Sequence, residues 1–343
     1  MKSTVTLSLA CCVSIVAAYN WTWAPAAVSA SKEVGNHVAG VPAWTQWFGS
    51  SAVADLQQPA LAGDVKTCVS SSGTKVWGSS FDDGPSDSTP KLLAYLAAKK
   101  IKLTFWVIGY NVLTNADILK QTYQSGHDIG IHTWSHPHLT QLSDDEVIAE
   151  LVYGARSIYE VLGVWPRYFR PPYGDADGRV RKLAALVGLT SVTWSRDSQD
   201  WVYYGNTTAL NTVIPANFRG WIGSGTNNDI SLEHDFASAT VDVGIKVLDM
   251  LLTAGYTIKP LSECLGGADP YNNTILTKFF ASGLFESKLG PVLTATPTGR
   301  LGFGAETGTV RVVVASQAAT SSASSVSEWI ARVANVAMLL RFV

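Results

Sequence analysis

Short apolar runs alternate with amphipathic segments through the middle of this chain. The run from Leu103 to Gly109 is typical of a buried strand. Before it, Ser88 and Thr89 can cap a helix that has Pro90 in its first turn. Further strands are expected at 128–132, 168–170, 190–195, 229–234 and 256–260. Further helices are expected at 116–124, 143–163, 179–186 and 241–252.

Repeated strand–helix units predict an α/β fold with a parallel sheet and helices outside it. Periodicity alone does not separate an open sheet from a closed barrel. In both architectures the chemistry belongs at the carboxyl ends of the strands. The alternation covers residues 71–266, which we expect to form one domain. Residues 19–70 are expected to be an N-terminal extension, and residues 267–320, where the regularity is lost, a C-terminal extension.

Both ends of the chain carry targeting patterns. Lys2 precedes an apolar run and small residues that end at Ala18, so residues 1–18 are expected to be a secretion signal, with a second cleavage position after Ala30. Residues 321–343 combine a serine-rich stretch with an apolar tail, which resembles a GPI-anchor signal. Arginines interrupt this tail, and an amphipathic helix is the alternative.

Composition narrows the range of partners. Hydrophobic residues make up 47% of the chain, which is enough for a substantial core. The formal net charge is −2 and the sequence pI is about 6.3. A chain of this charge lacks the excess of basic residues that neutralises a phosphate backbone. We therefore expect no nucleic acid partner.

Cysteine and asparagine positions fit an oxidising, secretory environment. Once the signal is removed, Cys68 and Cys264 remain, and two cysteines in such a compartment most simply form one disulfide. The triplets that begin at Asn20, Asn206 and Asn272 fit the pattern for N-glycosylation.

Acidic and imidazole side chains follow two of the expected strands. The segment 82–83 places two adjacent aspartates on a turn, and His132 and His136 lie four residues apart. Two imidazoles and one carboxylate make a facial arrangement that binds a divalent metal and leaves positions open for water and substrate. His127 precedes its strand and His138 lies out of step with the pair, so we expect neither to be a ligand.

Three more polar segments follow later strands. They are Arg170–Asp175, Asp197–Trp201 and Ile230–Asp235. In the last of them, strand alternation places Leu232 and His234 on the same face. An apolar wall beside an imidazole is thus expected at this strand end.

Together the five segments resemble the five motifs of carbohydrate esterase family 4, the polysaccharide deacetylases that share the NodB homology domain. The resemblance covers residues 75 to 266 approximately and is strongest to fungal chitin deacetylases. It implies a distorted (β/α) barrel with fewer strands than a regular eightfold barrel. It also implies a chitin deacetylase, which uses Zn²⁺ or Co²⁺ to hydrolyse the N-acetyl amide of N-acetylglucosamine units in chitin or chitin oligosaccharides.

The resemblance also assigns roles to individual residues. Asp83, His132 and His136 would bind the metal, and Asp82 would be the general base. His234 would be the general acid that protonates the leaving amine. These assignments agree with the chemistry, because a metal lowers the pKa of water and a nearby carboxylate can then accept its proton.

The remaining motif residues would support this machinery. By the same resemblance, Asp200 raises the pKa of the general acid, and Arg170 orients the general base. The Tyr173 backbone N–H would stabilise the oxyanion, and Trp201 and Leu232 would surround the acetyl methyl group. Five further aromatic residues are open to either sugar stacking or core packing: Trp134, Trp194, Trp221, Tyr203 and Tyr204.

Other functions stay open at this point. A deacetylase of peptidoglycan or acetylated xylan would carry the same motifs, because they report the acetyl group more than the polymer. A non-catalytic glycan-binding cell-wall protein is the alternative from another class, although the intact acidic and imidazole residues argue against it. A glycosidase is a poorer fit, since adjacent aspartates on one turn do not flank a glycosidic bond. We expect a monomer that is secreted, extracellular or in the cell wall.

Overall fold

The computed structural model describes residues 37–50, 63–69 and 74–288. The expected secretion signal at 1–18, the expected anchor signal at 321–343 and the triplet at Asn20 lie outside the described residues. Within the described part of the chain, no helix has both the length and the apolar character needed to cross a bilayer.

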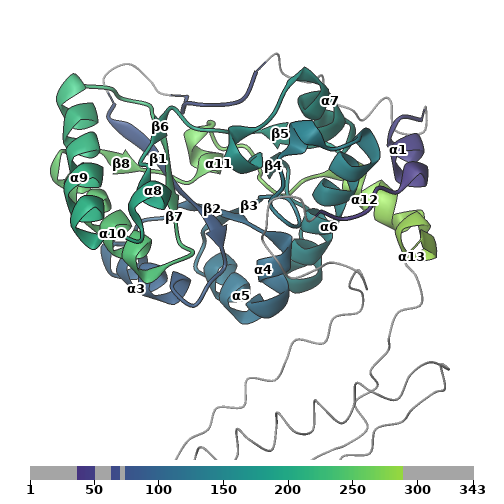
Figure 1. The fold of residues 1–343 in the computed structure, drawn as a ribbon, viewed down its shortest axis with the longest axis horizontal. Coiled ribbons are helices and arrows are strands. Elements are labelled where there is room, and N and C mark those ends of the chain that lie inside the picture. The colour runs from purple at the N-terminus through teal and green to yellow at the C-terminus, as the bar shows by residue number, and fades with distance from the viewer. Residues whose placement is uncertain (1–36, 51–62, 70–73, 289–343) are drawn as a thin grey trace, which may run out of the picture. The chain divides into compact units, whose positions relative to one another are not determined.

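A parallel sheet forms the centre of the domain (Figure 1). Its strands run in the order β5-β4-β3-β2-β1-β7-β6, and β8 pairs with the beginning of β1. All the pairings between these strands are parallel. The strands are β1 (Val76–Gly84), β2 (Thr104–Val107), β3 (Asp128–Ile131), β4 (Tyr168–Phe169), β5 (Thr190–Ser191), β6 (Arg196–Asp197), β7 (Ile230–His234) and β8 (Thr257–Ile258).

Helices cover the sheet, as the alternation predicts. They are α1 (Pro42–Phe48), α3 (Thr89–Lys99), α4 (Gly109–Thr114), α5 (Ala116–Gln124), α6 (Asp144–Leu162), α7 (Gly178–Leu186), α8 (Asp200–Tyr203), α9 (Thr207–Ser224), α10 (Ser238–Thr253), α11 (Leu261–Cys264), α12 (Thr274–Ala281) and α13 (Leu284–Lys288). The clearest sequence signals for a helix start and end belong to α6. Ser143 and Glu146 form a capping box at its start, and Gly163 ends it in the left-handed conformation.

Helices α4 and α9 are two of the elements that the sequence-based expectation did not include. The predicted strand from Leu103 to Gly109 is shorter in the structure, because α4 begins at Gly109. A side chain at Gly109 would meet the Trp134 ring at 2.7 Å and Gly154 of α6 at 3.1 Å, so glycine allows α4 to pack closely. The long helix α9 was not predicted, since its sequence is rich in threonine and glycine and contains Pro215.

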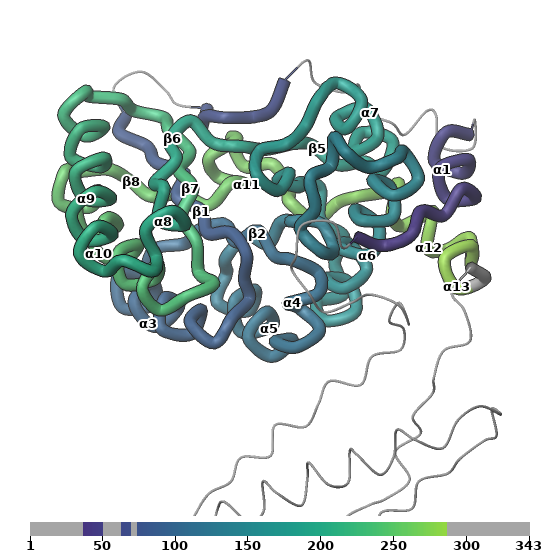
Figure 2. The backbone as a smooth tube through the Cα atoms, in the orientation of Figure 1, coloured from purple at the N-terminus to yellow at the C-terminus, as the bar shows by residue number. Residues whose placement is uncertain are grey.

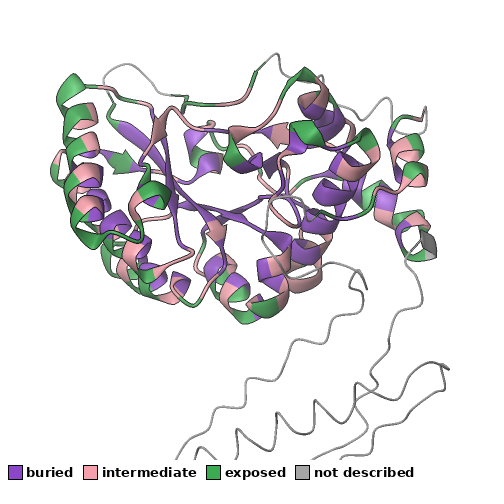
Figure 3. Ribbon diagram, in the orientation of Figure 1, coloured by how far each residue is buried: buried purple, intermediate pink, exposed green. Residues whose placement is uncertain are grey.

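The central strand β1 is buried along most of its length although its sequence is less apolar than usual (Figure 3). Trp77 and Phe81 lie on its helix-facing side, where Phe81 approaches Gly244 of α10. The hydroxyls of Ser79 and Ser80 donate hydrogen bonds to the Glu233 carboxyl group and the Ser231 carbonyl. Pairing with β7 thus satisfies the polar groups that the strand buries.

Part of the N-terminal extension pairs with residues next to the strands of the sheet. Val65 bridges to Val192 just after β5, and Thr67 bridges to Asp229 just before β7. The Cys68–Cys264 disulfide fixes this segment to α11 at the end of the domain. Residues 63–69 therefore connect the β5 edge to the β7 side of the sheet (Figure 2).

The segment after residue 266 contains regular structure where the sequence suggested none. Helices α12 and α13 lie there, with Phe279 and Phe285 buried. Both rings contact Trp44 of α1, at centroid distances of 5.7 and 5.2 Å. The sequence did not predict these short helices because they are stabilised by this aromatic packing, which involves distant residues, rather than by their length.

Glu150 of α6 is a fully buried carboxyl group that supports the loop after β3. It accepts hydrogen bonds from the backbone N–H groups of Trp134 and Ser135, from the Ser135 hydroxyl and from the backbone N–H of Val38. The loop between His132 and His136 is thereby attached to the helix layer.

Replacing Glu150 with alanine is expected to lower the free energy of unfolding by about 3 kcal/mol or more, because three backbone N–H groups lose their acceptor. The measurement is urea unfolding followed by tryptophan fluorescence. Glu263→Ala, an exposed position on α11, is the control and should change the value by about 0.5 kcal/mol at most. Equal stability of the two variants would contradict this role.

Candidate active site

The motif residues converge at the carboxyl ends of the parallel strands. Asp82 and Asp83 lie at the end of β1, and His132 directly follows β3. Arg170 follows β4, and His234 ends β7. Asp82 and His234 are register partners on adjacent strands. The sheet therefore brings together groups that are far apart in the sequence, as the strand-end rule predicts.

Asp83, His132 and His136 form a cluster of the kind that holds a metal ion. Their ligand atoms lie within 4.8 Å of one another. The Asp83 Oδ1 lies 3.5 Å from His132 Nε2 and 3.2 Å from His136 Nε2. No other group of three or more such residues occurs in the described part of the chain.

The surroundings of His132 suit a metal ligand. Its Nδ1 lies 2.7 Å from the Arg170 carbonyl oxygen, which only accepts hydrogen bonds, so Nδ1 carries the proton and Nε2 keeps its lone pair. Burial, together with the neighbouring His136, lowers the pKa of His132 well below its usual value. A neutral imidazole with its lone pair directed at Asp83 fits a divalent cation.

Backbone strain is concentrated in the motif loops. Six described residues other than glycine have a positive φ, and five of them lie in the motif segments: Asp83, Thr133, His136, Tyr173 and Gln199. Such conformations cost about 1–3 kcal/mol each and persist where the surroundings enforce them. One such contact is the hydrogen bond from the His136 N–H to the Thr133 hydroxyl.

Asp82 lies beside the cluster of Asp83, His132 and His136 and is held by Arg170. The Arg170 Nη1 donates to Asp82 Oδ1 at 2.8 Å, while Asp82 Oδ2 lies 3.6 Å from His132 Nε2. Burial raises the pKa of Asp82 to about 7, against the opposing effect of the Arg170 guanidinium. A carboxyl group with a pKa in this range is suited to accept a proton near neutral pH.

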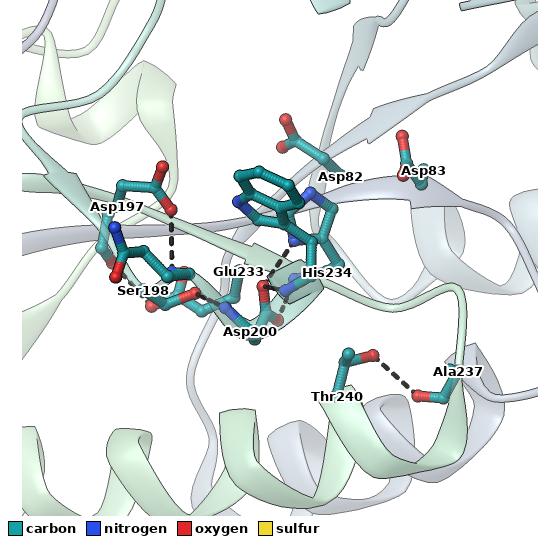
Figure 4. A network of polar contacts seen from close by, with 12 residues as sticks. Asp82, Asp83, Asp197, Ser198, Asp200, Glu233, His234, Ala237 and Thr240 are labelled. Atoms are coloured by element: carbon teal, nitrogen blue, oxygen red, sulfur yellow. Dashed lines mark hydrogen bonds and ion pairs between the residues drawn. The ribbon is translucent and has the colours of Figure 1, made fainter. Parts of the chain in front are cut away.

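His234 is paired with Asp200 of α8, as Figure 4 shows. Its Nδ1 lies 2.6 Å from Asp200 Oδ1, and its backbone N–H donates to Asp200 Oδ2. Burial alone lowers the pKa of His234, but the Asp200 carboxylate and the other acids nearby outweigh it and raise the pKa to about 10. The imidazole is thus protonated at neutral pH and can act as an acid.

A cleft with a volume of about 440 Å³ opens over these groups. The expected wall residues Trp201 and Leu232 line it, and so does Tyr173. Trp201 is 51% exposed and Tyr173 is 49% exposed, so both rings are accessible to a ligand. Leu232, on β7, is buried.

The structure divides the five aromatic residues that sequence reasoning left open. Trp194 and Tyr204 line the cleft. Trp134 is buried in the core, and Tyr203 and Trp221 pack against it. One lining residue, Phe236, escaped sequence reasoning. Its position two residues after His234, beyond the end of the strand, was the available signal.

The loop that carries Tyr173 is held by two imidazole rings. The Tyr173 ring stacks on His138 with a centroid distance of 4.0 Å and meets His136 edge-on at 4.6 Å. His138 also approaches the Asp175 carboxylate, which accepts the Thr140 N–H and hydroxyl. His138 is not part of the cluster of candidate metal ligands. His127 is not part of it either; it is buried and accepts a hydrogen bond from the Leu103 N–H.

The two described glycosylation triplets begin at exposed residues. Asn206 precedes α9, and its side-chain oxygen accepts the Ala209 N–H. Asn272 is exposed just before α12. Glycosylation of either residue stays a prediction.

Comparisons with known proteins agree with this geometry. The family model described as polysaccharide deacetylase matches residues 70–192. Chitin deacetylase 1 of Cryptococcus neoformans is 42% identical over 214 residues, which cover 56% of this chain and 44% of that protein. Chitin deacetylase 2 of Saccharomyces cerevisiae is 38% identical over 207 residues, which cover 60% of this chain and 62% of that protein.

Residues 70–192 therefore belong to a polysaccharide deacetylase domain. This domain is similar to the solved structure of the chitin deacetylase from the fungal pathogen Colletotrichum lindemuthianum, with a TM-score of 0.57 and 26% identity. The match covers 63% of this chain and 97% of that chain. The expected fold class, the distorted (β/α) barrel of polysaccharide deacetylases, is confirmed. The chain spans 44% and 62% of the lengths of the two curated relatives.

Replacing Asp200 with asparagine is expected to shift the alkaline limb of the pH–rate profile to lower pH. The Asp200 carboxylate raises the pKa of His234, and without it the effect of burial, which lowers that pKa, remains. The measurement is kcat/KM for acetate release across pH. Asp242→Asn, an exposed aspartate on α10, is the control. An alkaline limb that does not move would contradict the pairing.

Proposed function

We propose that this chain is a chitin deacetylase, which hydrolyses the N-acetyl amide of N-acetylglucosamine units in chitin and gives chitosan and acetate. The observation that carries the proposal is the cluster of Asp83, His132 and His136 beside Asp82 in a cleft with aromatic walls. The names of the two curated relatives, both chitin deacetylases, support chitin as the polymer.

The cluster suits a divalent metal, and we propose Zn²⁺ or Co²⁺ because imidazoles with one carboxylate favour ions of intermediate softness. A cation held by Asp83, His132 and His136 would polarise the amide carbonyl and lower the pKa of water. The lone pair on His132 Nε2, fixed by the hydrogen bond of Nδ1 to the Arg170 carbonyl, supports this assignment.

Asp82 is the proposed general base. Its Oδ1 is occupied by Arg170, and its Oδ2 faces the ligand cluster, so Oδ2 is the atom that would accept a proton from the attacking water. The Arg170 guanidinium is buried and hydrogen-bonded also to the Thr193 carbonyl, which fixes the direction of the carboxylate. A fixed base avoids the cost of orienting it in the transition state.

His234 is the proposed general acid. Its Nδ1 is paired with Asp200, which leaves Nε2 to face the cleft. As the carbon–nitrogen bond of the amide breaks, the Nε2 proton passes to the leaving amine nitrogen. The attacking water has given one proton to Asp82, and its hydroxyl group stays on the acetyl carbon. The products are therefore acetic acid, which ionises to acetate, and a glucosamine unit.

Two other parts of the cleft would contribute to the transition state. The Tyr173 backbone N–H, presented by a residue with φ of 59°, would donate to the developing oxyanion. Trp201 and Leu232 would contact the acetyl methyl group. An apolar pocket around this methyl group favours acetyl over larger acyl groups.

We also propose that the protein is secreted and acts outside the cell or in the cell wall, as a monomer. The Cys68–Cys264 disulfide supports an oxidising compartment. Attachment to the plasma membrane through a GPI anchor is proposed for residues 321–343 on their sequence pattern alone. Release by a phosphatidylinositol-specific phospholipase tests the anchor.

Acetate release across three polymers tests the proposed function. We expect release from chitin oligomers that a chelator abolishes and that added Zn²⁺ or Co²⁺ restores, because the ligand cluster requires a cation. Acetylated xylan and peptidoglycan are the comparison substrates. Faster release from either of them would replace chitin as the substrate, and no release from any would overturn the enzymatic proposal.

Two substitutions separate metal binding from proton transfer. His132→Ala is expected to lose the metal, whereas Asp82→Asn should keep the metal and lose about 100-fold or more in kcat. Metal content by mass spectrometry and single-turnover acetate release are the measurements. His138→Ala, an imidazole on the same loop outside the ligand cluster, is the control for metal content. The reverse pattern in the two variants would overturn the role assignment.

A further inference from the structure

A second cleft, with a volume of about 340 Å³, adjoins the active-site cleft. It is formed by the segment between β1 and α3, which carries Ser86, Asp87 and Ser88, and by Thr114 and Asn115 at the end of α4. Phe236 lines both clefts. The two clefts are therefore neighbours across a single aromatic side chain.

Phe236 lies between the two clefts and packs against two rings of the active-site cleft. Its ring meets the Tyr204 ring edge-on at 5.3 Å and lies 5.6 Å from the His234 ring. A polymer whose acetamide group reaches His234 has neighbouring sugar units on either side of that point. The second cleft lies on the Phe236 side of the active-site cleft.

The lining of the second cleft is polar and well ordered. The Ser86 hydroxyl donates to the Asp235 carbonyl and accepts the Ser88 N–H, and the Asn115 side chain donates to the Pro85 carbonyl. These hydrogen bonds fix the segment that carries Asp87. Hydroxyl, amide and carboxylate groups on a fixed loop are the partners that sugar hydroxyl and amino groups require.

Charge in the second cleft is negative. Asp87 is exposed and is the one charged side chain among the described residues that line this cleft. The lysine on the first turn of α3, Lys91, is paired with Asp242 of α10. An exposed carboxylate in a concave surface attracts a cationic group, although solvent keeps the attraction small.

We propose that the second cleft is a subsite for a neighbouring sugar unit whose amine is already free, and that Asp87 pairs with its ammonium group. The proposal rests on the proposed function, since deacetylation is the reaction that produces this amine. It implies that a deacetylated unit in the second cleft helps to hold the next acetylated unit at the active site. Successive units along one chain would then be preferred over scattered ones.

Binding of a fully deacetylated glucosamine oligomer tests the proposal without turnover. In mildly acidic buffer, where the amines are charged, Asp87→Asn is expected to weaken binding about two- to fivefold, the range for an exposed ion pair. The difference between wild type and variant should shrink at high salt. Calorimetry measures the affinity, and Asp269→Asn, an exposed aspartate that lines neither cleft, is the control.

The shape of the cleft gives an independent test. Thr114→Trp is expected to fill the second cleft and to weaken binding of the same oligomer, whereas Thr212→Trp on the exposed side of α9 should not. Unchanged affinity in both Asp87→Asn and Thr114→Trp would overturn the subsite. Because this assay measures binding alone, its result is separate from acetate release by the wild type, whose absence would overturn the proposed function instead.

Discussion

The buried ion pair between Arg170 and Asp82 is the interaction on which the site depends. Arg170 is fully buried, and its side chain reaches Asp82 on β1 as well as the carbonyls of Val192 and Thr193. Its own carbonyl fixes the tautomer of His132. One residue thus positions both the proposed base and a proposed metal ligand. Removing it would leave a buried carboxylate without its counterion, a change that costs about 3–5 kcal/mol in folded proteins.

The rest of the domain maintains a site with an unfavourable local conformation. Five non-glycine residues in the motif loops have positive φ, and Glu150, with the Tyr173–His138 stack, holds two of these loops in place. Packing beneath the loops, rather than the loops themselves, provides the stability that this strain consumes. The acids and imidazoles then work in a cleft whose walls are largely aromatic.

Sequence reasoning reached the site because its chemistry is local. The Asp82–Asp83 pair, the spacing of His132 and His136 and the end of β7 each carry their signal within a few residues. What it missed depends on contacts between distant segments. In the sequence, Glu150 resembles any other glutamate on a helix, although it is a hydrogen-bond acceptor for a distant loop. Residues 65–67 show no strand pattern, and the sequence of α9 contains weak helix formers. Only the fold reveals that Phe236 borders two clefts.

A crystal structure of the protein soaked in Zn²⁺, with anomalous diffraction at the zinc edge, tests the central claim most directly. The account predicts a single strong peak bounded by Asp83, His132 and His136, with Asp82 still held by Arg170 and an open position facing the cleft. A peak at other residues, or a metal whose coordination is completed by protein side chains, would contradict it.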